Sequence, residues 1–539
     1  MAVTIKKPIS KYYYSSQGQK WAVFGAGFFA AGTMTIIMVL LLISGITPRS
    51  MGNLVADKLA AVFPPQWQEF FIQLIGPLGK DLLFYGVLVG QVTVGGLLAL
   101  LFGWLWPRIG DKPTLWRNIF ILSTTFWLVL IFIGLPILDA GFIGLNLGSD
   151  QIIFLVTSFA LFQVYGLAFG YLYLRLVPPK VDSSVVGTSD DDEIEIGSAP
   201  SRRRFVIGLS AFFVTALAAG IGVGAFRTKS TEYWGSLGSV VSGSAKLQGE
   251  VTPVGTFYNV SKNAFDPSVS VQGWTLEVNG MVNKTLSYDY NTIRQLPVIN
   301  QAHTLTCISN PVGGQLIGNA EWKGTQLKTI LETAGVGAGV KKLVFTCADG
   351  YTDSITINTA LDPQTVLVWE MNGAPLEPSH GFPIRALIPN IYGMKNAKWI
   401  KQITLVDTEY EGFWQKQGWD NPAVIHTEST LTSLNNGAEV RSGERLTLQG
   451  FAFAGHRGIK KVEISTDGGQ NWLEAQVKDG LGQNSWQLWH LDWTPNGSGK
   501  TARLVVRATD KTGALQTNNK AEPFPEGSSG WNTISVKVI

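Results

Sequence analysis

The sequence contains little cysteine, histidine or charge. Only two cysteines occur among its 539 residues, Cys307 and Cys347, which excludes a disulfide scaffold, a cysteine-ligated zinc site and a Cys-x-x-Cys-His haem attachment. All five histidines lie at position 303 or later, so the preceding part of the chain has no histidine pair to hold a haem. The formal net charge is only +3, which gives no basis for a nucleic-acid partner.

Long apolar runs, by contrast, are frequent, and the mean hydropathy is +0.16. Five runs are long enough to cross about 30 Å of hydrocarbon as helices, at residues 21–44, 82–106, 119–138, 152–174 and 205–226. Buried helices of a soluble protein are the alternative, but runs of this length with almost no charge argue against it. We therefore expect five transmembrane helices.

The basic residues predict how these helices are oriented. Lysine and arginine gather before the first run, between the second and third, and between the fourth and fifth, which places those segments in the cytoplasm. Segments 46–81 and 139–150 suit the opposite face. An odd number of crossings then puts everything after residue 226 outside the membrane. Within the first outer segment, residues 54–75 fit either amphipathic helices at the interface or an ordinary loop.

A flexible acidic linker is expected at residues 181–204, because serine, glycine and acids predominate there. It ends in Ser201, three arginines and Phe205, followed by the last apolar run. This pattern resembles a twin-arginine export signal placed inside the chain, and that export route carries proteins already folded around a cofactor. The alternative is a simple positive-inside stop.

After residue 228 apolar and polar residues alternate between turn residues, which predicts an α+β or mostly β soluble region. A polar stretch at 425–442 indicates a domain boundary. Strands at sandwich-like spacing are expected beyond it, at residues 445–453, 460–465, 472–477, 486–491, 503–508 and 533–538. The turn Thr466-Asp467-Gly468-Gly469 supplies the positive φ angles of a tight hairpin.

The segment 305–314, LTCISNPVGG, is the most informative for chemistry. Cys307 follows a strand-like run and enters a loop with paired glycines, where backbone can approach a bulky ligand and a thiolate can bind a soft metal. A lone cysteine is more often a small buried apolar residue, and Cys347, in the strand-like run 343–348, is best interpreted that way. A bond between the two cysteines would abolish metal ligation.

Further motifs around this loop carry a family resemblance. Residues 257–258 (FY), 274–280 (WTLEVNG), 318–324 (GNAEWKG), 370–373 (EMNG), 380–385 (HGFPIR) and 392–399 (YGMKNAKW) resemble the molybdopterin-binding domain of the sulfite oxidase family. Residues 455–459, 465–469 and 506–510 resemble that family's immunoglobulin-like dimerisation domain. The resemblance covers nearly all of the chain after residue 230.

Together these patterns predict a multi-domain architecture. We expect a four-helix transmembrane region at 1–180, the linker at 181–204, and a fifth transmembrane helix at 205–230. The resemblance implies a mixed α/β molybdopterin domain at 231–422 and an immunoglobulin-like β-sandwich at 423–539, with a homodimer as one possible assembly.

The resemblance also implies roles for single residues. Cys307 corresponds to the protein thiolate on molybdenum, whose other two sulfur ligands come from the pterin dithiolene. Trp419 corresponds to an active-site tyrosine, and His303 borders the metal site or holds the structure by hydrogen bonds. The pterin and its phosphate correspond to polar, cationic and glycine positions: Asn310, His380, Arg385, Gly393, Lys395 and Lys398.

Departures from the family pattern concern the substrate. Sulfite oxidases have an arginine five residues after the cysteine, where this chain has Val312, and another shortly after the Phe-Tyr pair, where it has Asn259, Val260 and Ser261. Lys262 is the nearest cation. A dianion such as sulfite needs cations to offset its lost hydration, so sulfite is a doubtful substrate. Tryptophans 414, 419, 486, 489 and 493 form either an aromatic substrate wall or packed cores.

The resulting prediction is a molybdenum-cofactor oxidoreductase that transfers an oxygen atom, with Mo(VI) cycling with Mo(IV), on the outer side of a bacterial cytoplasmic membrane. Its expected partners are a small-molecule substrate and a separate electron-transfer protein or quinone-linked partner. The alternatives are a true sulfite oxidase and a non-catalytic surface or assembly module that retains the fold. Cys307, Arg385 and Lys398 together argue against the latter.

Overall fold

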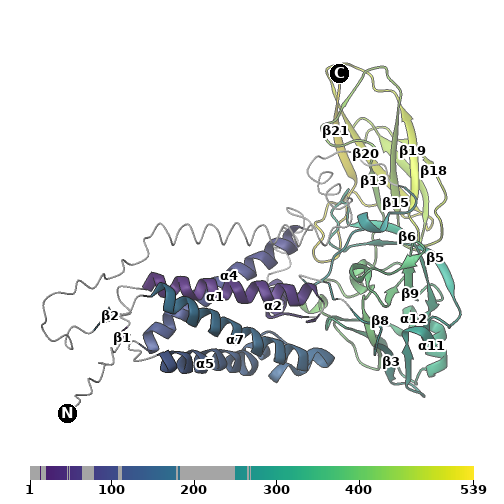
Figure 1. The fold of residues 1–539 in the computed structure, drawn as a ribbon. Helices are drawn as coiled ribbons and strands as arrows, with labels where there is room; N and C mark the ends of the chain where they lie inside the picture. The colour runs from purple at the N-terminus through teal and green to yellow at the C-terminus, as the bar shows by residue number, and fades with distance from the viewer. Residues whose placement is uncertain are drawn as a thin grey trace, which may run out of the picture. The chain divides into compact units, whose positions relative to one another are not determined.

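The structure is a computed structural model. It describes residues 12–13, 20–44, 46–47, 49–62, 78–106, 112–177, 180–181, 249–263, 266–267 and 269–539. Two compact units are present, a helical one in the first part of the chain and a β-rich one that contains residues 249–262 and 266–539 (Figure 1). The predicted fifth helix, the twin-arginine motif and nearly all of the acidic linker lie outside the described residues.

The helical unit contains four helices long and apolar enough to cross a membrane, which confirms four of the five predicted runs. They are α1 (Lys20–Ile43), α4 (Leu78–Leu105), α5 (Lys112–Val129) continued by η1 (Leu130–Gly134) and α6 (Leu135–Ile137), and α7 (Gln151–Leu176). Shorter elements are α2 (Met51–Val62), η2 (Phe142–Asp150) and the paired strands β1 (Tyr12–Tyr13) and β2 (Lys180–Val181). Thus the first part of segment 54–75 is helical.

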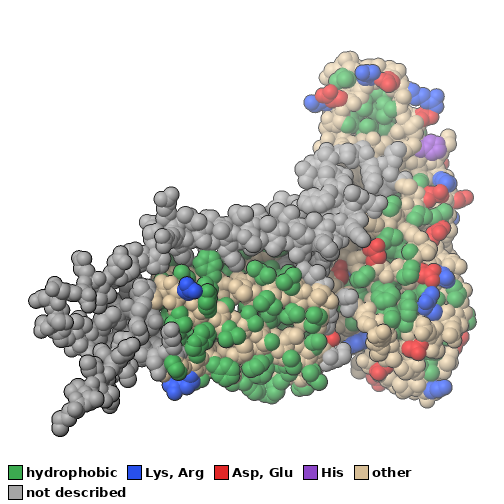
Figure 2. All heavy atoms as spheres, in the orientation of Figure 1, with side chains coloured by type: hydrophobic (Ala, Val, Ile, Leu, Met, Phe, Trp, Pro, Cys, Tyr) green, Lys and Arg blue, Asp and Glu red, His purple; other side chains and the backbone are tan. Residues whose placement is uncertain are grey.

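Small residues let α1 and α4 pack closely. A Cβ atom added at Gly27 would lie 2.3 Å from the Ala99 Cβ, and one added at Gly95 would lie 2.2 Å from the Ala31 Cβ. Small residues four apart on facing helices are a common device for close packing in membranes. The outer surface is apolar, as Figure 2 shows, with Leu97 more than half exposed. Such a surface is suited to lipid rather than water.

The first domain of the β-rich unit contains two five-stranded sheets. One has the order β10-β9-β6-β5 with β11 also paired to β9: β5 (Ile299–Thr306), β6 (Ile317–Gln326), β9 (Val366–Met371), β10 (Ala374–Pro375) and β11 (Arg385–Leu387). The other has the order β4-β3-β12-β7-β8: β3 (Thr275–Gly280), β4 (Leu286–Asp289), β7 (Lys342–Cys347), β8 (Thr352–Thr356) and β12 (Ile400–Val406). Only β3 and β12 pair in parallel among these described strands.

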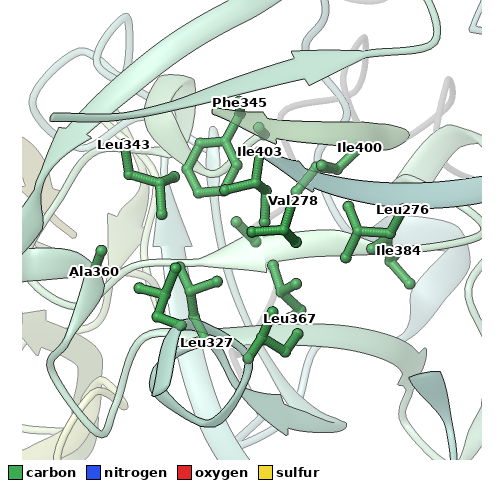
Figure 3. Close-up of a cluster of buried hydrophobic side chains, with 14 of the residues drawn as sticks. Leu276, Val278, Leu327, Leu343, Phe345, Ala360, Leu367, Ile384, Ile400 and Ile403 are labelled. Carbon is green, nitrogen blue, oxygen red and sulfur yellow. The ribbon is translucent and has the colours of Figure 1, made fainter. Parts of the chain in front are cut away.

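A hydrophobic core joins these sheets to helix α11 (Leu327–Ala334), with the short helices α10 (Tyr290–Ile293) and α12 (Ile357–Ala360) at its margin. Figure 3 shows Val278, Phe345 and Leu367, from three different strands, within this cluster. Cys347 is fully buried in the same cluster and forms no disulfide, which agrees with its interpretation as a core residue. The predicted mixed α/β domain is therefore confirmed.

The C-terminal domain is a sandwich of two sheets. The four-stranded sheet has the order β13-β15-β19-β18: β13 (Glu428–Leu431), β15 (Leu446–Phe453), β18 (Gln476–Val477) and β19 (Gln487–Trp493). The five-stranded sheet has the order β14-β21-β20-β16-β17: β14 (Glu439–Val440), β16 (Ile459–Ser465), β17 (Leu473–Glu474), β20 (Thr501–Asp510) and β21 (Asn532–Val538). Leu448 and Trp489 from the first sheet pack with Val462 and Leu504 from the second.

Three sequence predictions about this domain need correction. The polar stretch 425–442 contains β13 and β14, so it is part of the sandwich rather than only a boundary. The single strand expected at 472–477 is two short strands, because β17 pairs with β16 while β18 pairs with β19 in the other sheet. The buried Ala475 lies between them and marks the change of sheet. The predicted positive φ angles occur at Gly468 and Gly469, but the hairpin is not tight, because the pairing of β16 with β17 leaves residues 465–472 as a longer loop.

Candidate active site

One cavity of the first domain contains most of the predicted site residues. It encloses about 930 Å³ of space, part of it open to solvent. Its wall comes from the segment 257–262, the loop after β5, the turn after β7 and the region from His380 to Trp419. The lining residues with functional groups or aromatic rings include Tyr258, Lys262, Cys307, Asp349, Tyr351, His380, Arg385, Lys398, Trp399, Trp414 and Trp419.

The loop after β5 holds Cys307 at the cavity wall. The Cys307 amide donates to the Leu316 carbonyl at 2.9 Å, and the Asn310 amide donates to the Cys307 carbonyl at 3.0 Å, which closes a tight turn. The side-chain oxygen of Asn310 accepts from the Leu316 amide at 2.9 Å. Asn310 is buried but does not line the cavity, so its described contacts hold the loop in shape while the cysteine faces the cavity.

Arg385, the first residue of β11, is a buried cation without a carboxylate partner among the described residues. It donates to the carbonyls of His380 and Asn396 at 3.2 and 3.3 Å, and its Nε finds no protein acceptor. Burial lowers the pKa of this guanidinium to about 10, yet it stays charged near neutral pH. A buried guanidinium that lines a cavity and lacks a counter-charge is suited to binding an anion.

His380 and Lys398 lie on the same side of the site as Arg385. The His380 ring lies 3.3 Å from the Val254 carbonyl through Nε2. Burial, with the nearby Arg385 and Lys398, lowers the pKa of His380 to about 4, so the imidazole is neutral. Lys398 donates to Asn259 Oδ1 at 2.7 Å and to the Ser379 carbonyl at 2.9 Å. Arg385 and Lys398 therefore place two cations on this side of the cavity.

Gly393 begins the short helix η6 (Gly393–Lys395) and also lines the cavity. A Cβ atom at this position would lie 2.6 Å from the hydroxyl of Tyr258, so any side chain here would have to displace that hydroxyl. Because Gly393 has no side chain, its backbone lies directly at the cavity wall beside Tyr258. Exposed backbone amides in such a position can serve as hydrogen-bond donors to a phosphate.

Two further predicted residues do not reach the cavity. Lys395 is buried, and its ammonium donates to Asp353 Oδ1 at 2.8 Å, the Ser354 carbonyl at 2.8 Å and Asn421 Oδ1 at 3.1 Å. These contacts use all three of its hydrogens. His303 is buried outside the lining, and burial together with Arg385 lowers its pKa to about 3. Its Nδ1 has no protein partner, and its carbonyl accepts from the Trp322 indole at 3.0 Å.

The tryptophans predicted as an aromatic wall fall into two groups. Trp414 and Trp419 line the cavity, and the buried indole Nε1 of Trp419 finds no protein acceptor. Trp486 and Trp489 instead lie in packed clusters, where their indoles donate to the carbonyls of Glu250 and Phe451. Trp493 is packed at the margin of the sandwich core. Two of the five thus contribute to a wall, and three serve packing.

Charge near Trp414 is balanced rather than positive. Lys262 and Asp349 both line the cavity, and the Lys262 ammonium donates to the Asp349 carbonyl at 3.0 Å and lies 3.8 Å from a carboxylate oxygen of Asp349. Val260 lines the same region, whereas Val312 does not reach it. The sequence analysis did not identify Asp349 and Tyr351, although the polar turn directly after the buried strand β7 could have indicated cavity-lining residues there.

The chemistry of these residues fits a large anionic cofactor that brings its own metal ligands. Among the described residues, no group of three or more His, Cys, Asp or Glu side chains could hold a metal ion. A metal at Cys307 would therefore take its remaining ligands from outside the protein. The Cys307 thiol, the unpaired buried cation Arg385 and the space beside Gly393 suit a dithiolene pterin with a phosphate.

Comparisons with known proteins agree with this site. Residues 263–414 match the family described as "Oxidoreductase molybdopterin binding domain", and residues 422–524 match "Mo-co oxidoreductase dimerisation domain". The sulfite oxidase of Arabidopsis thaliana is 28% identical over 351 residues, which cover 54% of this chain and 87% of that protein. The mitochondrial sulfite oxidase of Mus musculus is 27% identical, over 54% of this chain and 62% of that protein.

One solved structure is also similar to this chain. The sulfane dehydrogenase SoxCD from Paracoccus pantotrophus is 25% identical with a TM-score of 0.50, over 54% of this chain and 82% of that chain. The two matched families occur in the same order as the α/β domain and the sandwich described above. These matches and the cavity around Cys307 and Arg385 show that the chain is a molybdopterin-dependent oxidoreductase with a molybdenum cofactor, similar to the sulfite oxidase family.

Proposed function

We propose that this chain transfers an oxygen atom to or from a substrate that is larger or less charged than sulfite, at a molybdenum held by Cys307. One observation carries the proposal: the Cys307 thiol and the unpaired guanidinium of Arg385 line the same cavity. When bound, the cofactor supplies two-electron oxygen-atom transfer between substrate and water. The protein supplies orientation, charge and exclusion of water.

The residues divide into cofactor-holding and supporting groups in this proposal. Arg385 and Lys398 offer cationic donors to the phosphate, while neutral His380 and the backbone at Gly393 lie where the pterin would pack. Asn310 and Lys395 act through other residues, because the first closes the Cys307 turn and the second holds Asp353. For His303, burial outside the lining favours the structural role over contact with the metal.

The proposed substrate follows from the other half of the cavity. Lys262 and Asp349 compensate each other's charge, Trp414 supplies an apolar face, and Trp419 offers one unpartnered indole hydrogen. A neutral molecule with a hydrogen-bond acceptor fits these groups better than a dianion. A screen of sulfoxides, N-oxides and sulfite with redox dyes tests this. Turnover with a neutral compound supports the proposal, and turnover with sulfite alone contradicts it.

Location and partners complete the proposal. Four apolar helices anchor the chain, and the basic residues between them favour a catalytic domain on the outer side of a bacterial cytoplasmic membrane. All histidines follow residue 302, so the described helices offer no histidine pair for a haem. Electrons would then pass to or from a separate protein or a quinone-linked partner. The match to a dimerisation domain supports a homodimer, and the two-sheet sandwich suits an immunoglobulin-like domain.

Lys395→Met is expected to lose mainly stability, whereas Arg385→Met is expected to lose mainly molybdenum. Lys395→Met leaves the fully buried Asp353 without its cation, which costs about 3 to 5 kcal/mol of stability. Arg385→Met removes a cation that has no carboxylate partner, so the cofactor-free protein loses less stability while the purified protein loses most of its molybdenum. Thermal unfolding and elemental analysis measure both. Molybdenum retained in Arg385→Met would remove this residue from the cofactor site.

Reporter fusions are expected to show the proposed topology. A reporter after Ile539 should be active only outside the cytoplasm, and one within residues 181–201 only inside. Arg202→Lys with Arg203→Lys preserves charge, so a simple positive-inside stop tolerates it, whereas twin-arginine export does not. Normal outward placement of the domain in this double variant would reject the export-signal interpretation.

A further inference from the structure

The C-terminal domain contacts the cysteine loop through residue Asn310, which does not line the cavity. The Ser528 hydroxyl donates to the Asn310 carbonyl at 2.7 Å. Asn310 is the residue whose amide closes the turn at Cys307. The Ser528 hydroxyl is therefore linked to Cys307, the predicted metal ligand, through the one turn from Cys307 to Asn310.

A second, independent contact brings the same loop against the sandwich. Gly313 has a φ of +77°, and a Cβ atom there would lie 2.2 Å from the side-chain nitrogen of Asn532. Asn532 is itself fixed, because its side-chain oxygen accepts from the Leu431 amide at 3.0 Å. Gly313 thus lets the loop approach the C-terminal domain, whereas Gly314 leaves room for the Asn310 side chain within the loop itself.

The segment that carries Ser528 also contacts Tyr392, the neighbour of the cavity-lining Gly393. A Cβ atom at Gly527 would lie 2.5 Å from the hydroxyl of Tyr392, the residue before Gly393. The Tyr392 hydroxyl accepts from the His426 amide, and the His426 ring lies 3.3 Å from the Ser528 carbonyl. Residues 527–528 therefore bridge two backbone segments that bear cavity-lining residues, Cys307 and Gly393.

This bridging segment is itself well fixed. The Gly527 amide donates to the Pro523 carbonyl at 2.7 Å, and Ala521 and Ser529 exchange backbone hydrogen bonds. The strand that leads into the cysteine loop is held from the same domain, because the Thr304 amide donates to the Asn484 carbonyl at 2.8 Å and the Trp486 amide donates to the Thr304 hydroxyl at 2.9 Å. A rigid support can limit the movement of what it contacts.

We propose that Ser528 is a positioning residue for Cys307, so that the C-terminal domain orders the metal-ligating loop within its own chain, in addition to any role in dimerisation. The inference rests on the proposed function of Cys307 as the molybdenum ligand. The hydrogen bond from Ser528 to Asn310 would hold the turn at Cys307 closed. Without this hydrogen bond, the turn opens more often and the Cys307 thiol leaves the cavity wall more often.

The test compares Ser528→Ala with Ser529→Ala in the full chain carrying Cys347→Ser, so that Cys307 is the only thiol. Ser529 is a matched control, because its hydroxyl also donates to a carbonyl at 2.7 Å, that of Asn519 within the sandwich. Alkylation of Cys307 in cofactor-free protein measures how often the loop opens. We expect Ser528→Ala to raise the rate about fivefold, the effect of one ordinary hydrogen bond, and Ser528→Thr to restore it.

The outcomes separate this inference from the proposed function. An unchanged alkylation rate in Ser528→Ala, or an equal rise in Ser529→Ala, would overturn the positioning role, whatever the metal content. Lower molybdenum retention in holoenzyme with Ser528→Ala but not with Ser529→Ala would support it. Absence of molybdenum from the parent protein would reject the proposed function instead, while the alkylation rates of cofactor-free protein would still report on the loop.

Discussion

Cys307→Ser is expected to leave the chain folded in the membrane and to lower turnover by more than about 100-fold, since altered outer partners of a metal ligand already cost about 10- to 100-fold. The reason is ligand softness: a hydroxyl oxygen is a poor replacement for a thiolate on molybdenum in this cavity. Dye-linked turnover and thermal unfolding measure the two properties separately. Full activity in Cys307→Ser would reject the proposed mechanism.

Cys347→Ser is the matched control for this result. Burial raises the pKa of the Cys347 thiol well above its ordinary range, so it stays protonated in the core and is unsuited to bind a metal. A hydroxyl in its place costs about 1 to 3 kcal/mol of stability and should leave molybdenum and turnover in place. Loss of molybdenum from Cys347→Ser would mean that the ligand had been assigned to the wrong cysteine.

Sulfite is expected to be oxidised slowly or not at all by the parent protein. Val260 lies at the cavity where the family has an arginine nearby, and Val312 replaces the other arginine, so two charge-assisted hydrogen bonds are missing. At about 1.5 to 3 kcal/mol each, their loss corresponds to roughly two to four orders of magnitude. Trp419 adds an apolar face and a single donor in place of the tyrosine hydroxyl.

Lys262→Ala tests whether the remaining cation compensates. Because Lys262 is already bonded to the Asp349 carbonyl and close to its carboxylate, we expect this variant to change sulfite-dependent dye reduction less than about tenfold. Lys416→Ala is the control, since Lys416 packs over Tyr410 and does not line the cavity. Robust sulfite turnover in the parent, lost in Lys262→Ala and kept in Lys416→Ala, would contradict the substrate argument.

Sequence patterns predicted those features whose cause is local. Uninterrupted apolar runs predicted five helices, four of which the described residues confirm, because a membrane span needs about twenty apolar residues in sequence. The difference between Cys307 and Cys347 was also local, since one enters a glycine-containing loop and the other ends a buried strand. Alternation likewise predicted most sandwich strands.

Features that depend on distant partners could not be predicted. Lys395 belongs to a motif associated with the pterin, but its ammonium is used by Asp353 and Asn421, which only the folded chain brings beside it. Lys262 stood as a lone cation in the sequence, yet its partner Asp349 lies 87 residues further along the chain. The same applies to Ser528, which reaches the Asn310 carbonyl over 218 residues.

Elemental and pterin analysis of the purified full chain tests the central claim most directly. The site around Cys307 and Arg385 predicts molybdenum in stoichiometric amount, with molybdopterin released on denaturation, and a large loss of both in Arg385→Met. The protein must come from cells that make the cofactor. A folded parent chain from such cells that contains neither molybdenum nor pterin would contradict the account.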